Sequence, residues 1–283
     1  MSIAELLFSL ELGMIFGIVA IGIYLTFRVI NFSDLTCDGS FVLGAAVSSI
    51  LLKSGYNPFL ALFAAVFAGV IAGLCTGILN IYFKVTAILS GILIGFMLYS
   101  INLKVMQGVP NLTLINETTI FSGYNPLVIL AMVSLVVWFI MSYFLVTNFG
   151  LALRSTGQNS LLSTTNGVKI EYMTMTGLAL GNACIALGGA LFSQHQGFVD
   201  ISQGIGTIIT GLAAVMLGEK LLPFRSPWIM IAACFLGSFL YRILVSYALH
   251  SEVLGLSTQD LNLITGALIV FVMIIPTRKI QTC

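Results

Sequence analysis

The chain consists largely of long apolar segments, each about as long as a membrane is thick. A helix needs ~20 mostly apolar residues to cross a bilayer. Segments near this length recur throughout the chain, with only short polar connections between them. Nine of them are candidate spans, at 4–27, 35–52, 58–82, 86–106, 127–147, 172–192, 204–218, 227–248 and 259–277. The pattern predicts a polytopic bundle of about nine transmembrane helices.

The composition excludes a water-soluble fold. Of the 283 residues, 59% are hydrophobic and only 7% are charged, whereas about a quarter of a soluble domain is charged. We therefore expect an all-α integral membrane protein. Because helices packed in a bilayer share one core, residues 1–283 are expected to form a single transmembrane domain. The net charge of +1 gives no indication of nucleic-acid binding, and the five cysteines lack the spacing of a metal site.

Two of the candidate spans, 35–52 and 204–218, are shorter than the others and rich in glycine or polar residues. A broken or re-entrant helix is tolerated at membrane depth only where it is buried in protein or lines a cavity. Either segment is therefore a candidate for such a helix.

The basic residues indicate an orientation, because cytoplasmic loops of membrane proteins are enriched in Lys and Arg. If the polar segment 148–171 is cytoplasmic, alternation of the spans places eight of the 11 basic residues inside. These eight are Arg28, Lys84, Arg154, Lys169, Lys220, Arg225, Arg278 and Lys279. Lys53 and Lys104 fall outside, with Arg242 near the outer end of the eighth span. For an odd number of spans, the N-terminus is then outside and the C-terminus in the cytoplasm.

Two local patterns predict how helices start and pack. The pentapeptide SGYNP occurs at 54–58 and again at 122–126, each time just before a candidate span. Asn followed by Pro is typical of a helix start, because Pro in the first turn loses no hydrogen bond. The repetition is either reuse of a good cap or the trace of an internal repeat. In the third span, Gly69, Gly73 and Gly77 form one face, which favours close helix packing.

Four charged residues fall in or beside the apolar segments, where a charge is costly and marks a candidate functional site. Asp34 and Asp38, four residues apart at the start of the second span, would share one face of a helix. They form either a polar helix start, favoured by the helix dipole, or a hinge or gate of the solute path. Glu11 faces either the bundle or water. Arg242 could pair with Glu11 or with Asp200.

The predicted outer connection SQHQGFVDISQG (193–204) is polar. We expect its side chains to form a surface that docks a partner or receives the solute. The simpler interpretation of His195 alone is a solvated loop residue. The candidate residues of this outer group are Gln194, His195, Gln196 and Asp200.

The segment RSTGQNSLLSTTNG (154–167) is rich in hydroxyl and amide side chains, although apolar spans surround it. The chain has no GxxxxGK[ST] sequence, so it cannot bind ATP in the P-loop manner. It also has no HExxH or GxSxG sequence. We therefore do not expect an enzyme, and if ATP is the energy source a partner must hydrolyse it.

Three segments resemble the permease subunits of the branched-chain amino acid family of ABC importers. The segment FGLALRSTGQNSLLSTTNGVKI (149–170) is similar to the cytoplasmic loop of that family. Its matching residues are Gly150, Ala152, Arg154, Gly157, Asn159, Gly167 and Val168. NFSDLTCDGSFVLGAAV (31–47) is similar to the family's Asn-Phe segment and small-residue helix, and GIGTIITGLAAVMLGE (204–219) to its late helix. The DLTCDGSF sequence suggests an amino-acid-type subgroup.

The resemblance implies a transport complex. A pair of permease subunits, identical or related, would form the path. Two cytoplasmic ATPase subunits would bind ATP, and an external solute-binding protein would deliver the solute. The permease itself would bind no cofactor. The loop would supply a coupling helix that sits in a groove of the ATPase, with Leu161 and Leu162 buried there. The residues of this coupling group are Arg154, Gly157, Asn159, Leu161, Leu162 and Gly167.

The sequence thus predicts the membrane-spanning permease subunit of an ATP-driven importer, surrounded by lipid in the bacterial cytoplasmic membrane. The solute is small, with an amino acid as the favoured class. The alternative is a secondary transporter or channel that works alone. It would use the charges of Asp34, Asp38, Glu11 and Arg242 for ion coupling or gating.

Overall fold

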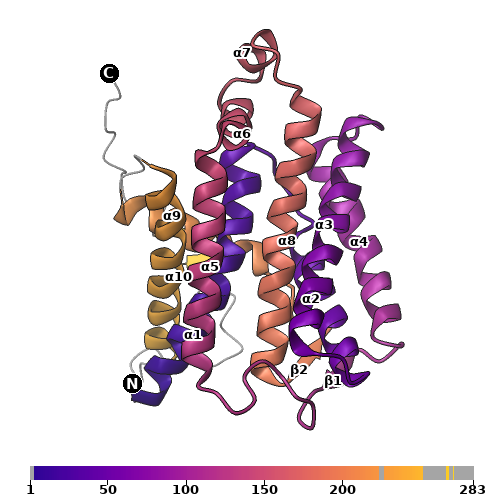
Figure 1. Cartoon of the computed structure of the whole chain (residues 1–283), viewed down its shortest axis with the longest axis vertical. Coiled ribbons are helices and arrows are strands. Elements are labelled where there is room, and N and C mark those ends of the chain that lie inside the picture. The colour runs from indigo at the N-terminus through magenta and orange to yellow at the C-terminus, as the bar shows by residue number, and fades with distance from the viewer. Residues whose placement is uncertain (1–2, 223–225, 251–265, 268–269, 271–283) are drawn as a thin grey trace.

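The computed structural model of the chain describes residues 3–222, 226–250, 266–267 and 270. Most of these residues lie in helices of an elongated bundle (Figure 1). We call the end of the bundle that carries α6 and α7 the α7 end. The opposite end carries β1 and β2, and we call it the ribbon end. The elements are α1 (Ile3–Tyr24), the π-helical turn η1 (Leu25–Val29), α2 (Cys37–Lys53), α3 (Pro58–Ile81), α4 (Ala87–Val105), β1 (Asn111–Thr113), α5 (Pro126–Val146), α6 (Asn148–Gln158), α7 (Ser160–Thr165), α8 (Ile170–Gln196), β2 (Phe198–Asp200), α9 (Thr207–Leu221) and α10 (Pro227–His250).

Six of the described helical segments are long and apolar enough to cross a membrane. They are Glu5–Val29, Pro58–Ile81, Ala87–Val105, Pro126–Val146, Ile170–Gln196 and Pro227–Tyr247. A polytopic helical bundle is thus confirmed, but the count of nine is not. With 17 residues in α2 and 15 in α9, these helices fall below the ~20 residues of a full span. The ninth candidate span, 259–277, lies outside the described residues except for 266, 267 and 270.

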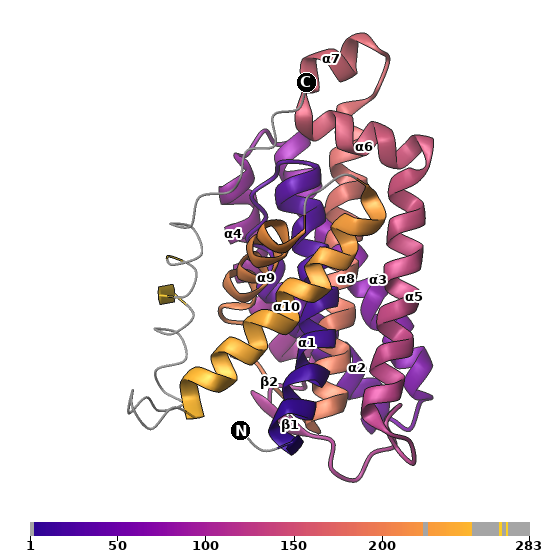
Figure 2. The ribbon, with the colours of Figure 1, turned by 90° about the vertical axis from the view of Figure 1, so that its left-hand side faces the viewer.

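The long helix α8 packs against α1, α2 and α3 and so lies at the centre of the bundle. Glycines allow these close approaches. A Cβ added at Gly69 or Gly73 of α3 would run into carbonyl oxygens of α8, and one at Gly189 of α8 would run into the backbone of α2. The predicted glycine face is therefore a packing face, as expected where lipid supplies no hydrophobic drive. On the other side of α1 lie α9 and α10, with α10 crossing α1 obliquely (Figure 2).

Large apolar side chains cover the outward faces of α3, α4 and α5. Phe63 is 76% exposed, Phe96 75% and Phe139 53%. A soluble monomer rarely exposes contiguous apolar surfaces of this kind. Lipid or another apolar partner would cover them, which agrees with a membrane protein.

The repeated SGYNP pattern forms two similar helix starts. The side chains of Asn57 and Asn125 each accept a hydrogen bond from the backbone N–H two residues later, at 2.9 and 3.1 Å. Pro58 and Pro126 occupy the first turn, where a missing N–H leaves no broken hydrogen bond. Both predicted starts are confirmed, and α3 and α5 both begin at the ribbon end.

The two short helices α2 and α9 begin beside each other inside the bundle. Asp38, in the first turn of α2, accepts hydrogen bonds from the backbone of Gly206 at 3.2 Å and of Ile208 at 2.9 Å, at the start of α9. From this meeting point α2 runs toward the ribbon end and α9 toward the α7 end (Figures 1 and 2). Non-helical segments, 31–36 and 201–206, lead into them. Protein surrounds these helix starts, as irregular backbone at membrane depth requires.

A small antiparallel ribbon joins two connections at one end of the bundle. It ties the α4–α5 connection to the α8–α9 connection. The paired residues are Asn111↔Asp200, Leu112↔Val199 and Thr113↔Phe198. Strands this short leave no recognisable periodicity, and the all-α prediction does not include them.

Candidate functional site

A buried polar cluster lies where the segment before α2 meets α8. Asp34 is fully buried. One of its carboxylate oxygens accepts a hydrogen bond from the Thr36 backbone at 2.9 Å, and the other accepts one from the Asn182 amide at 2.7 Å. The Asn182 oxygen in turn accepts a hydrogen bond from the Ser40 hydroxyl at 2.6 Å. Such donors are required, because a buried carboxylate without them is strongly destabilising.

Asp34 and Asp38 accept hydrogen bonds at the starts of two different helices. The expectation that they share one helical face is wrong, because α2 begins at Cys37 and Asp34 precedes it. Asp34 accepts a backbone hydrogen bond at the start of α2, and Asp38 accepts two at the start of α9. A carboxylate is favoured at both places by the positive end of the helix dipole. These contacts support the interpretation as polar helix starts, and the gate role stays a prediction.

The other two charged residues of the predicted gate lie in separate surroundings. Glu11 forms a hydrogen bond with His195, with 2.9 Å between Oε2 and Nε2. The guanidinium of Arg242 lies 3.8 Å from the centre of the Phe16 ring, a cation–π contact. Within the described residues Arg242 forms no ion pair, so the expected pairing with Glu11 or Asp200 is wrong. The four charged residues therefore do not form one cluster.

Two members of the predicted outer group are built into the protein interior. Gln194 is 3% exposed; its amide donates to the Ser48 hydroxyl at 2.9 Å, and its oxygen accepts from the Ile120 backbone at 3.1 Å. It thereby joins α8 to α2 and to the α4–α5 connection. The His195 side chain is 7% exposed. The expectation of an exposed surface is wrong for both residues.

Gln196 and Asp200 remain partly exposed at the ribbon end. Asp200 accepts hydrogen bonds from the Ser202 backbone at 2.7 Å and from the Asn111 amide at 3.3 Å. Hydrogen bonds from the Ser202 hydroxyl and backbone hold the pKa of the Asp200 carboxyl below its usual range. Asp200 therefore supplies a stable negative charge at this end of the bundle.

The polar segment 154–167 forms the end of α6 and all of α7, which projects from the bundle (Figure 1). Asn159 separates the two helices and caps α7 by accepting a hydrogen bond from the Leu162 backbone at 3.0 Å. The Ser163 hydroxyl bonds to that of Ser155 at 3.1 Å and so ties α7 to α6. Leu161 and Leu162 are 78% and 59% exposed. The helix α7 thus exposes two adjacent leucines and is held to α6 by a hydrogen bond.

In the coupling group, a side chain would clash at Gly157, and the backbone conformation favours glycine at Gly167. A Cβ at Gly157 would run into the carbonyl oxygen of Val29, so only glycine lets α6 lie this close to η1. Gly167 has φ +80°, in the left-handed region that favours glycine, where the chain turns from α7 toward α8. Arg154, also on α6, lines a cavity together with side chains of α1 and α9.

Sequence reasoning missed three residues that carry contacts at these sites. Asn182 bridges α8 to the α2 start. The Thr76 hydroxyl bonds to that of Thr36 at 2.8 Å, and Glu219 pairs with Arg28. An amide inside a span and a carboxylate at the end of a span are costly in lipid, so the positions of Asn182 and Glu219 in the sequence could have indicated them.

Within the part of the chain that the structure describes, no three His, Cys, Asp or Glu side chains gather as metal ligands would.

Comparison with known proteins places this arrangement in a family. Over residues 5–274 the chain matches the family described as branched-chain amino acid transport system / permease component. It is 36% identical over 259 residues to the tyrosine transport system permease protein of Clostridioides difficile (strain R20291), covering 91% of this chain and 86% of that protein. It is 33% identical over 281 residues to an uncharacterized protein of Rickettsia prowazekii (strain Madrid E), covering 97% and 98%. No solved structure matches the chain significantly.

A more distant relative is also a permease protein. The autoinducer 2 import system permease protein of Salmonella choleraesuis (strain SC-B67) is 25% identical over 224 residues, which cover 77% of this chain and 63% of that protein. The family match spans most of the chain, and six helical segments suited to a membrane agree with it. These findings confirm the resemblance that three segments of the sequence predict. The chain belongs to the family of permease components of branched-chain amino acid transport systems, the membrane subunits of ATP-driven importers.

Proposed function

We propose that this chain forms the path of an amino acid importer in the bacterial cytoplasmic membrane, and that α7 couples it to the ATPase. The observation that carries the proposal is the exposed pair Leu161 and Leu162 on a helix that projects from the bundle. Burial of such a pair in a partner's groove is favourable, at ~25 cal/mol per Å² of apolar surface. Because α7 is tied to α6, a movement of the ATPase groove would reach the bundle.

The α7 end is proposed to be the cytoplasmic end, with the start of α1 outside. The distribution of basic residues supports this orientation, since cytoplasmic loops are enriched in them. The described basic residues at the α7 end are Arg28, Lys84, Arg154, Lys169 and Lys220, against Lys53 and Lys104 at the ribbon end. The predicted inside residues Arg225, Arg278 and Lys279 lie outside the described residues, as does the C-terminus.

The complex would hold this chain, as one permease domain over 1–283, with a second copy or a related permease. Two ATPase subunits would bind ATP, and lipid would cover the outer faces. A solute-binding protein would dock at the ribbon end. Gln196 and Asp200 are proposed as its contacts, because they are the partly exposed members of the predicted outer group.

The proposed solute class rests on a relative. The Clostridioides difficile protein is called a tyrosine transport system permease protein, and it is similar over 91% of this chain. L-Tyrosine is therefore the first solute to test. The alternative of a stand-alone secondary transporter has lost its support, since its four charged residues lie in separate surroundings.

The experiment changes Leu161→Asp and Leu162→Asp together in the reconstituted importer. Charges cannot enter an apolar groove without a large desolvation penalty. We expect the double variant to reach the membrane at normal levels, to lose the co-purifying ATPase, and to show at least tenfold slower ATP-driven uptake of L-tyrosine.

A charge-matched control places the same substitutions at the opposite end. Val109 and Ile115 are 46% and 83% exposed near the ribbon end. The variant Val109→Asp, Ile115→Asp should keep the ATPase bound. Retention of the ATPase and of uptake in the α7 variant would refute the coupling role. A wild-type complex that hydrolyses ATP but imports no amino acid would instead refute the solute class.

A further inference from the structure

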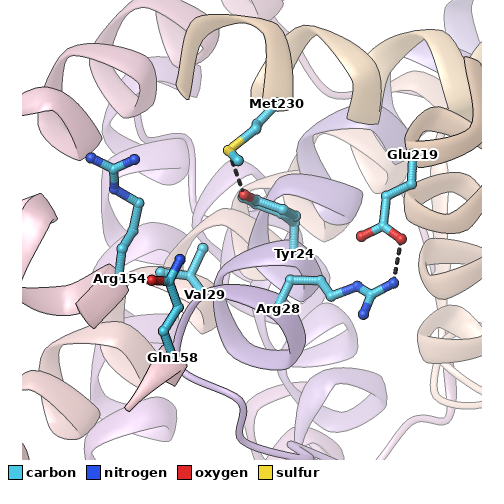
Figure 3. Close-up of a pocket in the computed structure, with 7 residues that line it drawn as sticks. All are labelled: Tyr24, Arg28, Val29, Arg154, Gln158, Glu219 and Met230. Carbon is cyan, nitrogen blue, oxygen red and sulfur yellow. Dashed lines mark hydrogen bonds and ion pairs between the residues drawn. The ribbon is translucent and has the colours of Figure 1, made fainter. Parts of the chain in front are cut away.

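A cavity of about 400 Å³ opens at the α7 end, between α1, η1, α6, α9 and α10 (Figure 3). Its volume lies in the range of small-molecule sites, ~300–1,000 Å³. The lining side chains used below are Tyr24, Arg28, Arg154, Gln158, Glu219 and Met230. Neither the family resemblance nor the predicted coupling and gate groups assign a ligand to this cavity.

The cavity carries opposite charges on two sides. Arg154 lies on one side of Tyr24 and Glu219 on the other (Figure 3). Within the described residues Arg154 makes no ion pair, and its Nε is buried without a hydrogen-bond partner. An anionic group in the cavity would give this unpaired guanidinium a counter-charge and charge-assisted hydrogen bonds.

Glu219 supplies the complementary charge. Its Oε2 pairs with Arg28, which comes from η1, and the Glu219 side chain is only 15% exposed. Figure 3 shows the second carboxylate oxygen directed toward Tyr24 and away from Arg28. This oxygen faces the cavity and suits a group that donates hydrogen bonds and carries positive charge, such as an ammonium.

Between these charges lie the Tyr24 ring and the Met230 thioether (Figure 3). The Tyr24 hydroxyl donates a hydrogen bond to the Met230 sulfur at 3.0 Å. An aromatic ring and a thioether adapt to side chains of different shape. Gln158, one turn after Arg154 on α6, adds an amide to the lining.

We propose that this cavity binds a zwitterionic α-amino acid, with its carboxylate at Arg154 and its ammonium at Glu219. The proposal rests on the proposed function, which makes the α7 end cytoplasmic and the solute an amino acid. Such a ligand would join α6 to α9. Because α6 leads directly into α7, the site lies next to the element proposed to receive the motion of the ATPase.

The test uses the whole complex with its ATPase subunits, in nanodiscs and without the solute-binding protein. Equilibrium binding of radiolabelled L-tyrosine and L-leucine is measured, since both carry the two groups that the site recognises. Tyramine, which lacks the carboxylate, and 3-(4-hydroxyphenyl)propionate, which lacks the ammonium, serve as competitors. We expect both to compete at least tenfold more weakly than L-tyrosine.

Single substitutions assign the binding to this cavity. Arg154→Gln and Glu219→Gln should each weaken amino acid binding at least tenfold, and Arg154→Lys should restore part of it. Lys84→Gln and Glu171→Gln are the matched controls, because both residues are exposed at the same end and neither lines the cavity. The controls should bind as the wild type does.

The outcomes separate the site from the proposed function. Amino acid uptake by the complete importer, with binding that none of these variants changes, would overturn the site and leave the function intact. Absence of uptake in the wild type would refute the function itself. Binding that follows phosphatidylethanolamine in the nanodisc, and not the added amino acid, would assign the two charges to a lipid headgroup and overturn the proposal.

Discussion

Asn182 is the side chain on which the buried polar cluster depends. Its amide group donates to Asp34 and its oxygen accepts from Ser40, so one residue of α8 bonds both to the segment before α2 and to the first turn of α2. A hydrogen bond to a charged group contributes more than a neutral one, and a buried carboxylate that loses a donor is left poorly satisfied.

Substitution of Asn182 by Leu is therefore expected to lower the free energy of unfolding by about 3 kcal/mol. Asn80→Leu is the control, because among the described residues that amide donates only to the Val85 carbonyl, at 2.8 Å, and its loss should cost about 1 kcal/mol. Thermal unfolding of the purified protein in detergent compares the two. Equal melting temperatures for the two variants would show that the buried cluster adds no particular stability.

At the scale of the elements, α2 and α9 depend on each other. The carboxylate of Asp38 caps the first turn of α9, while its own backbone belongs to the first turn of α2. If α2 and α9 move relative to each other, these hydrogen bonds must break; if the bonds persist, the two helices must move together. The junction between the starts of α2 and α9 is therefore a candidate moving part of the path.

Asp38→Ala is expected to lower the free energy of unfolding by about 1 kcal/mol, the usual effect of a lost cap, and to reduce uptake while the ATPase stays bound. Asp38→Asn keeps an acceptor and should preserve more of both. Asn57→Ala removes a cap of similar strength from α3 at the ribbon end. Its stability loss should match that of Asp38→Ala without loss of uptake. Equal uptake in the two alanine variants would argue against a role of the α2–α9 junction in transport.

At the scale of the whole molecule, the bundle has two chemically different ends. The α7 end carries most of the described basic residues and the projecting apolar pair, whereas the ribbon end carries the Asp200 carboxylate and the short β-ribbon. This asymmetry is what positive-inside topology requires, and it gives the proposed ATPase and binding protein different surfaces.

The orientation is tested with single cysteines in a chain whose five native cysteines are replaced by serine or alanine. Ile115 and Thr165 are both exposed, at the ribbon end and on α7 respectively. In intact spheroplasts, a membrane-impermeant maleimide should label Ile115→Cys and leave Thr165→Cys unlabelled until the membrane is opened. The reverse pattern would invert the topology, together with the proposed sides of the ATPase and the binding protein.

Local sequence patterns were sufficient for the helical membrane class, the starts of α3 and α5, the glycine face of α3 and the family. Each of these rests on patterns inside single segments, because an apolar run, a cap, a helical face and a family motif are short-range properties. The partners of Asp34, Gln194 and Glu11 are 148, 146 and 184 residues away in the chain. Only the packing of α8 against α1 and α2 brings them together. The tertiary structure therefore decided which polar residues are buried and paired, and which of them line the cavity at the α7 end. A polar side chain in an apolar chain must find a partner, but the sequence alone does not say which one.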